Sequence, residues 1–131
     1  MPARSSFDYA VIRVVPRVER EEFVNAGVIL FSRTRRFLGA EIDLDRERLA
    51  VLAPWLDLDE VERQLALIPV ICSGDPAGGP IAELPIWERF HWLVAPRSTV
   101  IQTSPVHSGL CQDPEAALVH LVDTLVRPPA S

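Results

Sequence analysis

The chain has 131 residues, 48% of them hydrophobic, which is the size of one domain with a core that needs no disulfide or metal. Its 13 basic residues are all arginine and are outnumbered by 18 acids, and this balance argues against sequence-independent binding to nucleic acid. Two cysteines are too few for a secreted disulfide framework, and no signal peptide or membrane span is indicated, so we expect a single compact domain over residues 1–131 in the cytoplasm.

Three strands are predicted early in the chain, at residues 7–15, 23–32 and 37–42. Apolar side chains occupy both faces of the second one, which predicts an interior strand covered on both sides. Gly27 within this strand indicates a β-bulge or the close approach of another backbone segment.

The tip of the hairpin between the second and third strands is the densest positive spot in the sequence, with arginines at Arg33, Arg35 and Arg36. A solvated hairpin end that discourages edge pairing is the commoner use of such charges. An anion or phosphate site is the alternative.

Four helices are predicted, at residues 45–53, 58–71, 86–94 and 114–126, and acids that can cap a helix precede the second and the fourth. Residues 73–84 are rich in glycine and proline, which predicts a mobile loop. A last strand is expected at 99–103, followed by an irregular segment at 104–112. These elements predict an α+β domain with a mainly antiparallel sheet of about four strands that carries the helices.

The short helix predicted at 86–94 carries two tryptophans, Trp87 and Trp92. They can form a small apolar cluster beneath the glycine-rich loop or an exposed patch that binds another protein. In the second case, the tryptophans and the hairpin arginines together form a candidate interface.

Polar residues near the strand ends form the other candidate site: Arg13, Glu22, Asn25, Arg97, Gln102, Ser104 and His107. They can meet at one end of the sheet if the first and last strands lie beside the central one. Such a cluster is either an internal network of ion pairs and amides or a ligand site.

No catalytic residue, cofactor or metal is predicted. Ser104 or Cys111 with His107 contains the residue types of a nucleophile and its base, but the surrounding sequence matches no nucleophile motif. His91, Cys72, His107 and Cys111 are metal-ligand types without the close pairing that structural zinc sites show.

Three stretches, FDYAVIRVVP, EEFVNAGVILF and RFHWLVAPRSTVIQTSPVHSGLCQDPEAAL, together resemble a family of small bacterial proteins classified as a domain of unknown function, number three thousand and thirty-seven in that series. The resemblance implies a soluble bacterial domain and carries no catalytic assignment. Some members are encoded beside a kinase-like protein similar to the HipA toxin kinases, which implies such a kinase as a partner.

Two functions follow from these observations. The first is a non-catalytic accessory domain that binds a protein partner through the tryptophan-bearing segment and the sheet edge next to the hairpin arginines. The second is a small enzyme, or a domain that binds a nucleotide or phosphate, with a polar pocket at one end of the sheet. A closed cluster of paired polar groups favours the first function, whereas a concave pocket with convergent, unpaired arginine and histidine favours the second.

Overall fold

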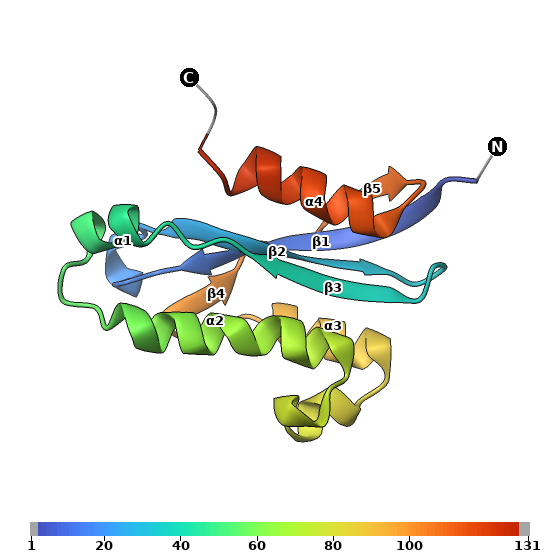
Figure 1. Cartoon of the computed structure of the whole chain (residues 1–131), viewed down its shortest axis with the longest axis horizontal. Helices are drawn as coiled ribbons and strands as arrows, with labels where there is room; N and C mark the ends of the chain where they lie inside the picture. Colours follow the sequence, from blue (N-terminus) through green and yellow to red (C-terminus); the bar gives the residue numbers. More distant parts are fainter. Residues whose placement is uncertain (1–2, 129–131) are drawn as a thin grey trace.

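An antiparallel five-stranded sheet runs through the middle of the protein, and helices cover both of its faces (Figure 1). The computed structural model describes residues 3–128. The strand order is β3-β2-β1-β4, and β5 also pairs with β1. The strands are β1 (Ser5–Val14), β2 (Val24–Ser32), β3 (Phe37–Ile42), β4 (Ile101–Thr103) and β5 (His107–Cys111). The predicted α+β class with a mainly antiparallel sheet is confirmed.

The central strand β2 has the interior position that its apolar sequence predicts. It pairs with β1 on one side and β3 on the other. Ile29 and Phe31 belong to the core beneath α2 and α3, and Val28 and Leu30 belong to a second core beneath α4. Both faces of β2 are therefore buried, which explains its nearly continuous apolar run.

The predicted irregularity at Gly27 is a β-bulge with a close backbone approach. Gly27 pairs with Ile12, whereas the next pair of the ladder is Asn25 with Arg13, so Ala26 is the extra residue on β2. A Cβ atom on Gly27 would lie 2.5 Å from the backbone oxygen of Glu41. Only glycine leaves room for β3 at this position.

The four helices lie close to their predicted ranges, at α1 (Arg46–Leu52), α2 (Leu58–Ser73), α3 (Ile86–Val94) and α4 (Pro114–Leu125). Asp57 caps α2 by accepting a hydrogen bond from the Glu60 amide at 3.2 Å. The helix continues two residues past the predicted end and stops at Gly74, which has a left-handed φ of 76°. Figure 1 shows α2 and α3 on one face of the sheet and α4 on the other.

The glycine- and proline-rich segment after α2 contains two short 3-10 turns, η2 (Pro76–Gly78) and η3 (Pro80–Glu83). A further turn, η1 (Val18–Arg20), connects β1 to β2. The mobility expected for residues 73–84 stays a prediction. No helix within residues 3–128 is both long and apolar enough to cross a membrane.

The edge of the sheet beyond β1 differs from the prediction. Residues 104–112, expected to be irregular, contain β5, and β4 pairs with β1 and not with the central strand. β1 begins at Ser5, so it is long enough to pair with β4 over Ile12–Val14 and with β5 over Ser5–Tyr9. The sequence of β5 is rich in polar and small residues, and the strand exists because β1 offers an unpaired edge.

Candidate functional site

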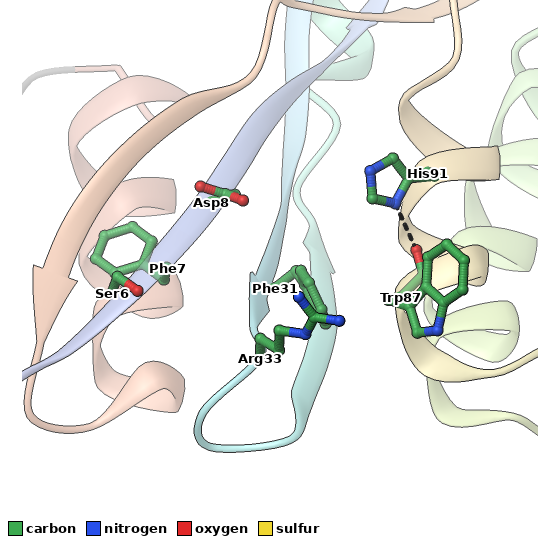
Figure 2. A pocket seen from close by; sticks show the side chains of 7 residues that line it. All are labelled: Ser6, Phe7, Asp8, Phe31, Arg33, Trp87 and His91. Carbon is green, nitrogen blue, oxygen red and sulfur yellow. Dashed lines mark hydrogen bonds between the residues drawn. The ribbon is translucent and has the colours of Figure 1, made fainter.

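A pocket of about 290 Å³ opens between α3 and the part of the sheet next to the β2–β3 turn (Figure 2). We call it the α3–β1 pocket. Its lining comes from β1, from the end of β2 and from α3: Ser6, Phe7, Asp8, Phe31, Arg33, Trp87 and His91.

Local sequence patterns explain why these side chains meet. Ser6 and Asp8 occupy alternate positions of β1, so they share a face with Ile12, which lies in the core further along the strand. Trp87 and His91 are four residues apart on α3 and therefore lie on one side of that helix. Phe90 stacks on Phe31 at 5.1 Å between ring centroids, and this contact holds α3 against β2 beside the pocket.

The polar groups of the pocket have defined hydrogen-bonding states. The Ser108 hydroxyl donates to Asp8 Oδ1 at 2.7 Å. His91 Nδ1 lies 2.7 Å from the Trp87 carbonyl oxygen, which can only accept, so Nδ1 is the donor of this hydrogen bond. Figure 2 shows the His91 imidazole and the Asp8 carboxylate on opposite sides of the pocket.

Arg33 enters the pocket from a turn that is fixed to β1. The Arg36 amide donates to the Arg33 carbonyl at 3.2 Å, and the Ser32 hydroxyl donates to the Ser6 carbonyl at 3.0 Å. Arg35 donates to the Ser5 hydroxyl and the Ala3 carbonyl, both at 2.8 Å. Arg35 therefore anchors the turn. Arg33 and Arg36 form no ion pair with any residue in the described part of the chain.

The structure brings three of the seven predicted polar residues together in one row across the sheet. Arg13 pairs with Asn25 on β2 and with Gln102 on β4. The Arg13 guanidinium lies 4.1 Å from the centre of the Phe23 ring, and Asn25 Nδ2 donates to the Leu125 carbonyl at 3.0 Å. Arg13 Nε and Asn25 Oδ1 are buried without a hydrogen-bond partner. None of the three lines the α3–β1 pocket.

Glu22 and Arg97 lie outside this row and make local contacts. Glu22 forms an ion pair with Arg20. Arg97 donates to the carbonyl of Leu93 at 2.9 Å and to that of Trp92 at 2.6 Å, so it caps the end of α3. Its guanidinium also lies 4.4 Å from the centre of the Trp92 ring.

Ser104 lies next to the row, opposite Val11 of β1, and His107 lies further along β1, opposite Tyr9. Ser104 is 4% exposed, and its hydroxyl oxygen accepts a hydrogen bond from the Val11 amide at 2.8 Å. This bond gives the Val11 amide an acceptor at the point of β1 that lies between its pairing with β4 and its pairing with β5. His107 is exposed on β5 and lies beside Tyr9, with 5.4 Å between ring centroids.

Two members of the candidate interface, Trp87 and Arg33, line the α3–β1 pocket, whereas Trp92 lies beneath Arg97 and Arg35 anchors the turn. Sequence reasoning missed Ser6, Asp8 and Phe31, and it considered His91 only as a metal-ligand type. The available signal was Ser6 and Asp8 at alternate positions near the start of a mainly apolar strand. Polar residues on a face that is apolar elsewhere mark the point where the covering helix ends.

Both cysteines, Cys72 and Cys111, are free and buried. Within residues 3–128, no three His, Cys, Asp or Glu side chains are grouped to hold a metal ion. Burial raises the pKa of the Cys72 thiol to about 12, although the charge of Arg89 acts in the opposite direction. A thiol with this pKa stays protonated and is a poor nucleophile.

Comparison with known proteins finds one family. Residues 9–126 match the family model described as "Protein of unknown function (DUF3037)". Neither the curated proteins nor the solved structures contain a significant match. Because the family model covers most of the sequence, the chain belongs to the DUF3037 family.

Proposed function

We propose that this protein is a non-catalytic protein-binding domain whose partner contacts the α3–β1 pocket. The observation that carries the proposal is that Trp87 and Arg33, far apart in the sequence, line one pocket beside an open sheet edge. Trp87 is 46% exposed. Tryptophan and arginine are the residue types that most often dominate binding energy at protein interfaces.

The neighbouring strand β5 extends this surface. Leu110 pairs with Ser6 and Ser108 pairs with Asp8, so both β5 side chains share the pocket face of the sheet. Leu110 is 65% exposed. The surface that contains the pocket therefore carries an exposed aromatic residue on α3 and an exposed aliphatic residue on β5, and both are suited to contact a partner.

The non-catalytic part of the proposal rests on how the reactive side chains are used. Ser104 is buried and bonded to the backbone of β1, and the Cys72 thiol is protonated. His107 lies beside Tyr9 on β5. No nucleophile and base in this set are placed to act on a common substrate.

A second candidate function, binding of a nucleotide or phosphate, is favoured by one observation. Arg33 and His91, whose side chains can donate hydrogen bonds to an anion, line the same pocket. The carboxylate of Asp8 shares that lining and repels anions, which makes this function the weaker candidate. Titration calorimetry with ATP and with inorganic phosphate tests it directly.

The partner that the family resemblance implies is a HipA-like kinase, so the first experiment uses a HipA-like kinase from the native host. The two purified proteins are mixed and examined by size-exclusion chromatography and titration calorimetry. We expect Trp87→Ala to weaken the complex by about 2 kcal/mol, roughly thirtyfold, as for an interface hot spot. Trp55→Ala is the matched control, because Trp55 is also exposed (54%) and does not line the pocket.

Two results would contradict the proposal. One is recovery of the untagged protein from its host as a monomer with no partner. The other is a complex whose affinity is unchanged in Trp87→Ala while circular dichroism shows the variant to be folded. Binding to a different host protein that requires Trp87 would support the function and reject only the kinase.

A further inference from the structure

Four arginines gather at one end of the sheet: Arg4, Arg33, Arg35 and Arg36. Figure 1 shows the start of β1, the β2–β3 turn and β5 at this same end. The hydrogen bonds of Arg35 to Ser5 and Ala3 hold the segment that contains Arg4 against the turn. We call these four residues the arginine cluster.

The arginine cluster is not neutralised by the rest of the described chain. Among residues 3–128, none of its members forms an ion pair, whereas Arg20, Arg46, Arg63 and Arg127 each pair with one or more carboxylates. The protein has a net charge of −5, so this uncompensated positive region contrasts with the whole molecule. A partner of opposite charge would gain most of its electrostatic attraction here.

The cluster is also held in place before any partner arrives. Ser32, at the end of β2, is fully buried and bonded to the Ser6 carbonyl, and the Arg35 amide lies 3.4 Å from its hydroxyl oxygen. The exposed guanidinium groups of Arg33 and Arg36 therefore extend from a fixed turn, and binding orders only their side chains.

We propose that the partner presents an acidic peptide segment to this end of the sheet, an inference that rests on the proposed protein-binding function. An apolar or aromatic side chain of the segment enters the α3–β1 pocket beside Trp87 and Phe31. Carboxylates that flank this side chain bind Arg33 and Arg36.

Asp8 favours a peptide over a phosphate or a nucleic acid. One of its oxygens accepts from Ser108, and its remaining lone pairs can accept a backbone N–H of a bound peptide. A fully ionised phosphate group has no such donor, so it gains no hydrogen bond to Asp8 that offsets the repulsion between the two anions. The net negative charge of the whole protein adds to the repulsion of a long nucleic acid.

The test selects peptides without assuming their sequence. A phage library of random peptides of about twelve residues, the length of a short extended motif, is panned on the intact protein and, in parallel, on the Arg33→Gln/Arg36→Gln double variant. We expect the intact protein to enrich peptides with Asp or Glu on both sides of an apolar residue. The double variant should not enrich them.

The affinity of one selected peptide, labelled with fluorescein, is then measured by anisotropy. We expect the double glutamine variant to bind about tenfold or more weakly, and the affinity of the intact protein to fall as salt is raised from about 0.05 to about 0.5 M. Arg48→Gln/Arg63→Gln is the matched control, because it removes the same charge elsewhere. Arg33→Lys/Arg36→Lys keeps the charge and should retain much of the affinity.

The inference is overturned if the selected peptides lack acids, if the double glutamine variant enriches the same peptides, or if oligo(dT) binds the cluster more tightly than they do. Its failure can be told apart from failure of the proposed function. A partner whose binding needs Trp87 but tolerates Arg33→Gln/Arg36→Gln would reject the acidic segment and leave the protein-binding function standing.

Discussion

At the scale of single residues, Ser104 shows how a side chain that resembles a nucleophile serves the backbone. It lies where β4 ends, and the break before β5 would leave the Val11 amide of β1 without a partner. The buried hydroxyl accepts from that amide and donates to the Pro105 carbonyl. A short polar side chain therefore lets one edge of β1 pair with two separate strands.

We expect Ser104→Ala to lower the free energy of unfolding by about 1–3 kcal/mol, because the Val11 N–H stays buried with no acceptor. Urea denaturation followed by circular dichroism measures the loss. Ser73→Ala is the control, since its exposed hydroxyl only donates to the Val70 carbonyl, and its effect should stay within about 0.5 kcal/mol. Equal effects of the two substitutions would contradict this role of Ser104.

At the scale of elements, the bulge in β2 determines which residues face which core. Ala26 shifts the alternation, so Val24 and Ala26 join Ile29 in the core beneath α2. Asn25 is directed to the opposite face, where it bonds to the end of α4. The bulge thus places one polar side chain at the point where α4 ends.

We expect Gly27→Ala to cost about 1–3 kcal/mol of stability, because the new methyl group meets the Glu41 backbone oxygen at 2.5 Å and must separate β2 from β3. Hydrogen exchange should show faster exchange in the β2–β3 ladder. Gly79→Ala provides the comparison: its φ of 78° makes alanine unfavourable, but no atom lies within 4 Å of the added Cβ. That variant should leave exchange in the ladder unchanged, and the same pattern in both would refute the steric explanation.

The end of α4 is attached to β3 by Arg127. Its guanidinium donates to Asp43 Oδ2 at 2.6 Å, and it also pairs with Glu41 and Asp123. The hydrogen bonds to Asp43 and Asp123 raise the pKa of Arg127 above its already high ordinary value, so the cation persists at every accessible pH.

We expect Arg127→Met to increase hydrogen exchange in the last turns of α4 while α2 keeps its protection, because this arginine connects α4 to the sheet. Arg63→Met removes an ion pair that lies wholly within α2 and should not change exchange in α4. Unchanged α4 protection in Arg127→Met would show that apolar packing of Leu118 and Val122 is sufficient to hold the helix.

At the scale of the whole molecule, two apolar cores lie on opposite faces of one sheet. Cys72 is a buried member of the larger core, so the state of its thiol indicates whether that core is closed. Its folded pKa of about 12 exceeds the ordinary value of 9.0, so the folded state binds the thiol proton more tightly than the unfolded state does. Its contribution to stability is complete below pH 9 and is lost as the pH rises from 9 towards 12.

We expect iodoacetamide to modify Cys72 slowly in native buffer near pH 8 and rapidly in concentrated urea, because exposure of this thiol requires the core beneath α2 to open. Mass spectrometry of the digested protein identifies the modified cysteine. Rapid modification of Cys72 in native buffer would show that α2 opens locally.

Local sequence patterns were sufficient to predict most of the helices and strands. The apolar run around Ile29 predicted an interior strand, Asp57 and Asp113 predicted the starts of two helices, and Gly27 predicted the bulge, because each signal depends on neighbours along the chain. β5 was missed because its own residues favour no strand. It forms only because β1 has an unpaired edge.

The sequence by itself determined the α+β class, the central strand and the helix caps, since hydrophobic periodicity and capping chemistry act over a few residues. Only the tertiary structure decided the candidate site. It combined Trp87, Arg33 and Asp8 in one pocket and placed His107 opposite Tyr9, four residues along β1 from Arg13. The physical reason is that strand order and the position of α3 are set by how the sheet buries its two faces, and this packing joins segments that no local pattern connects.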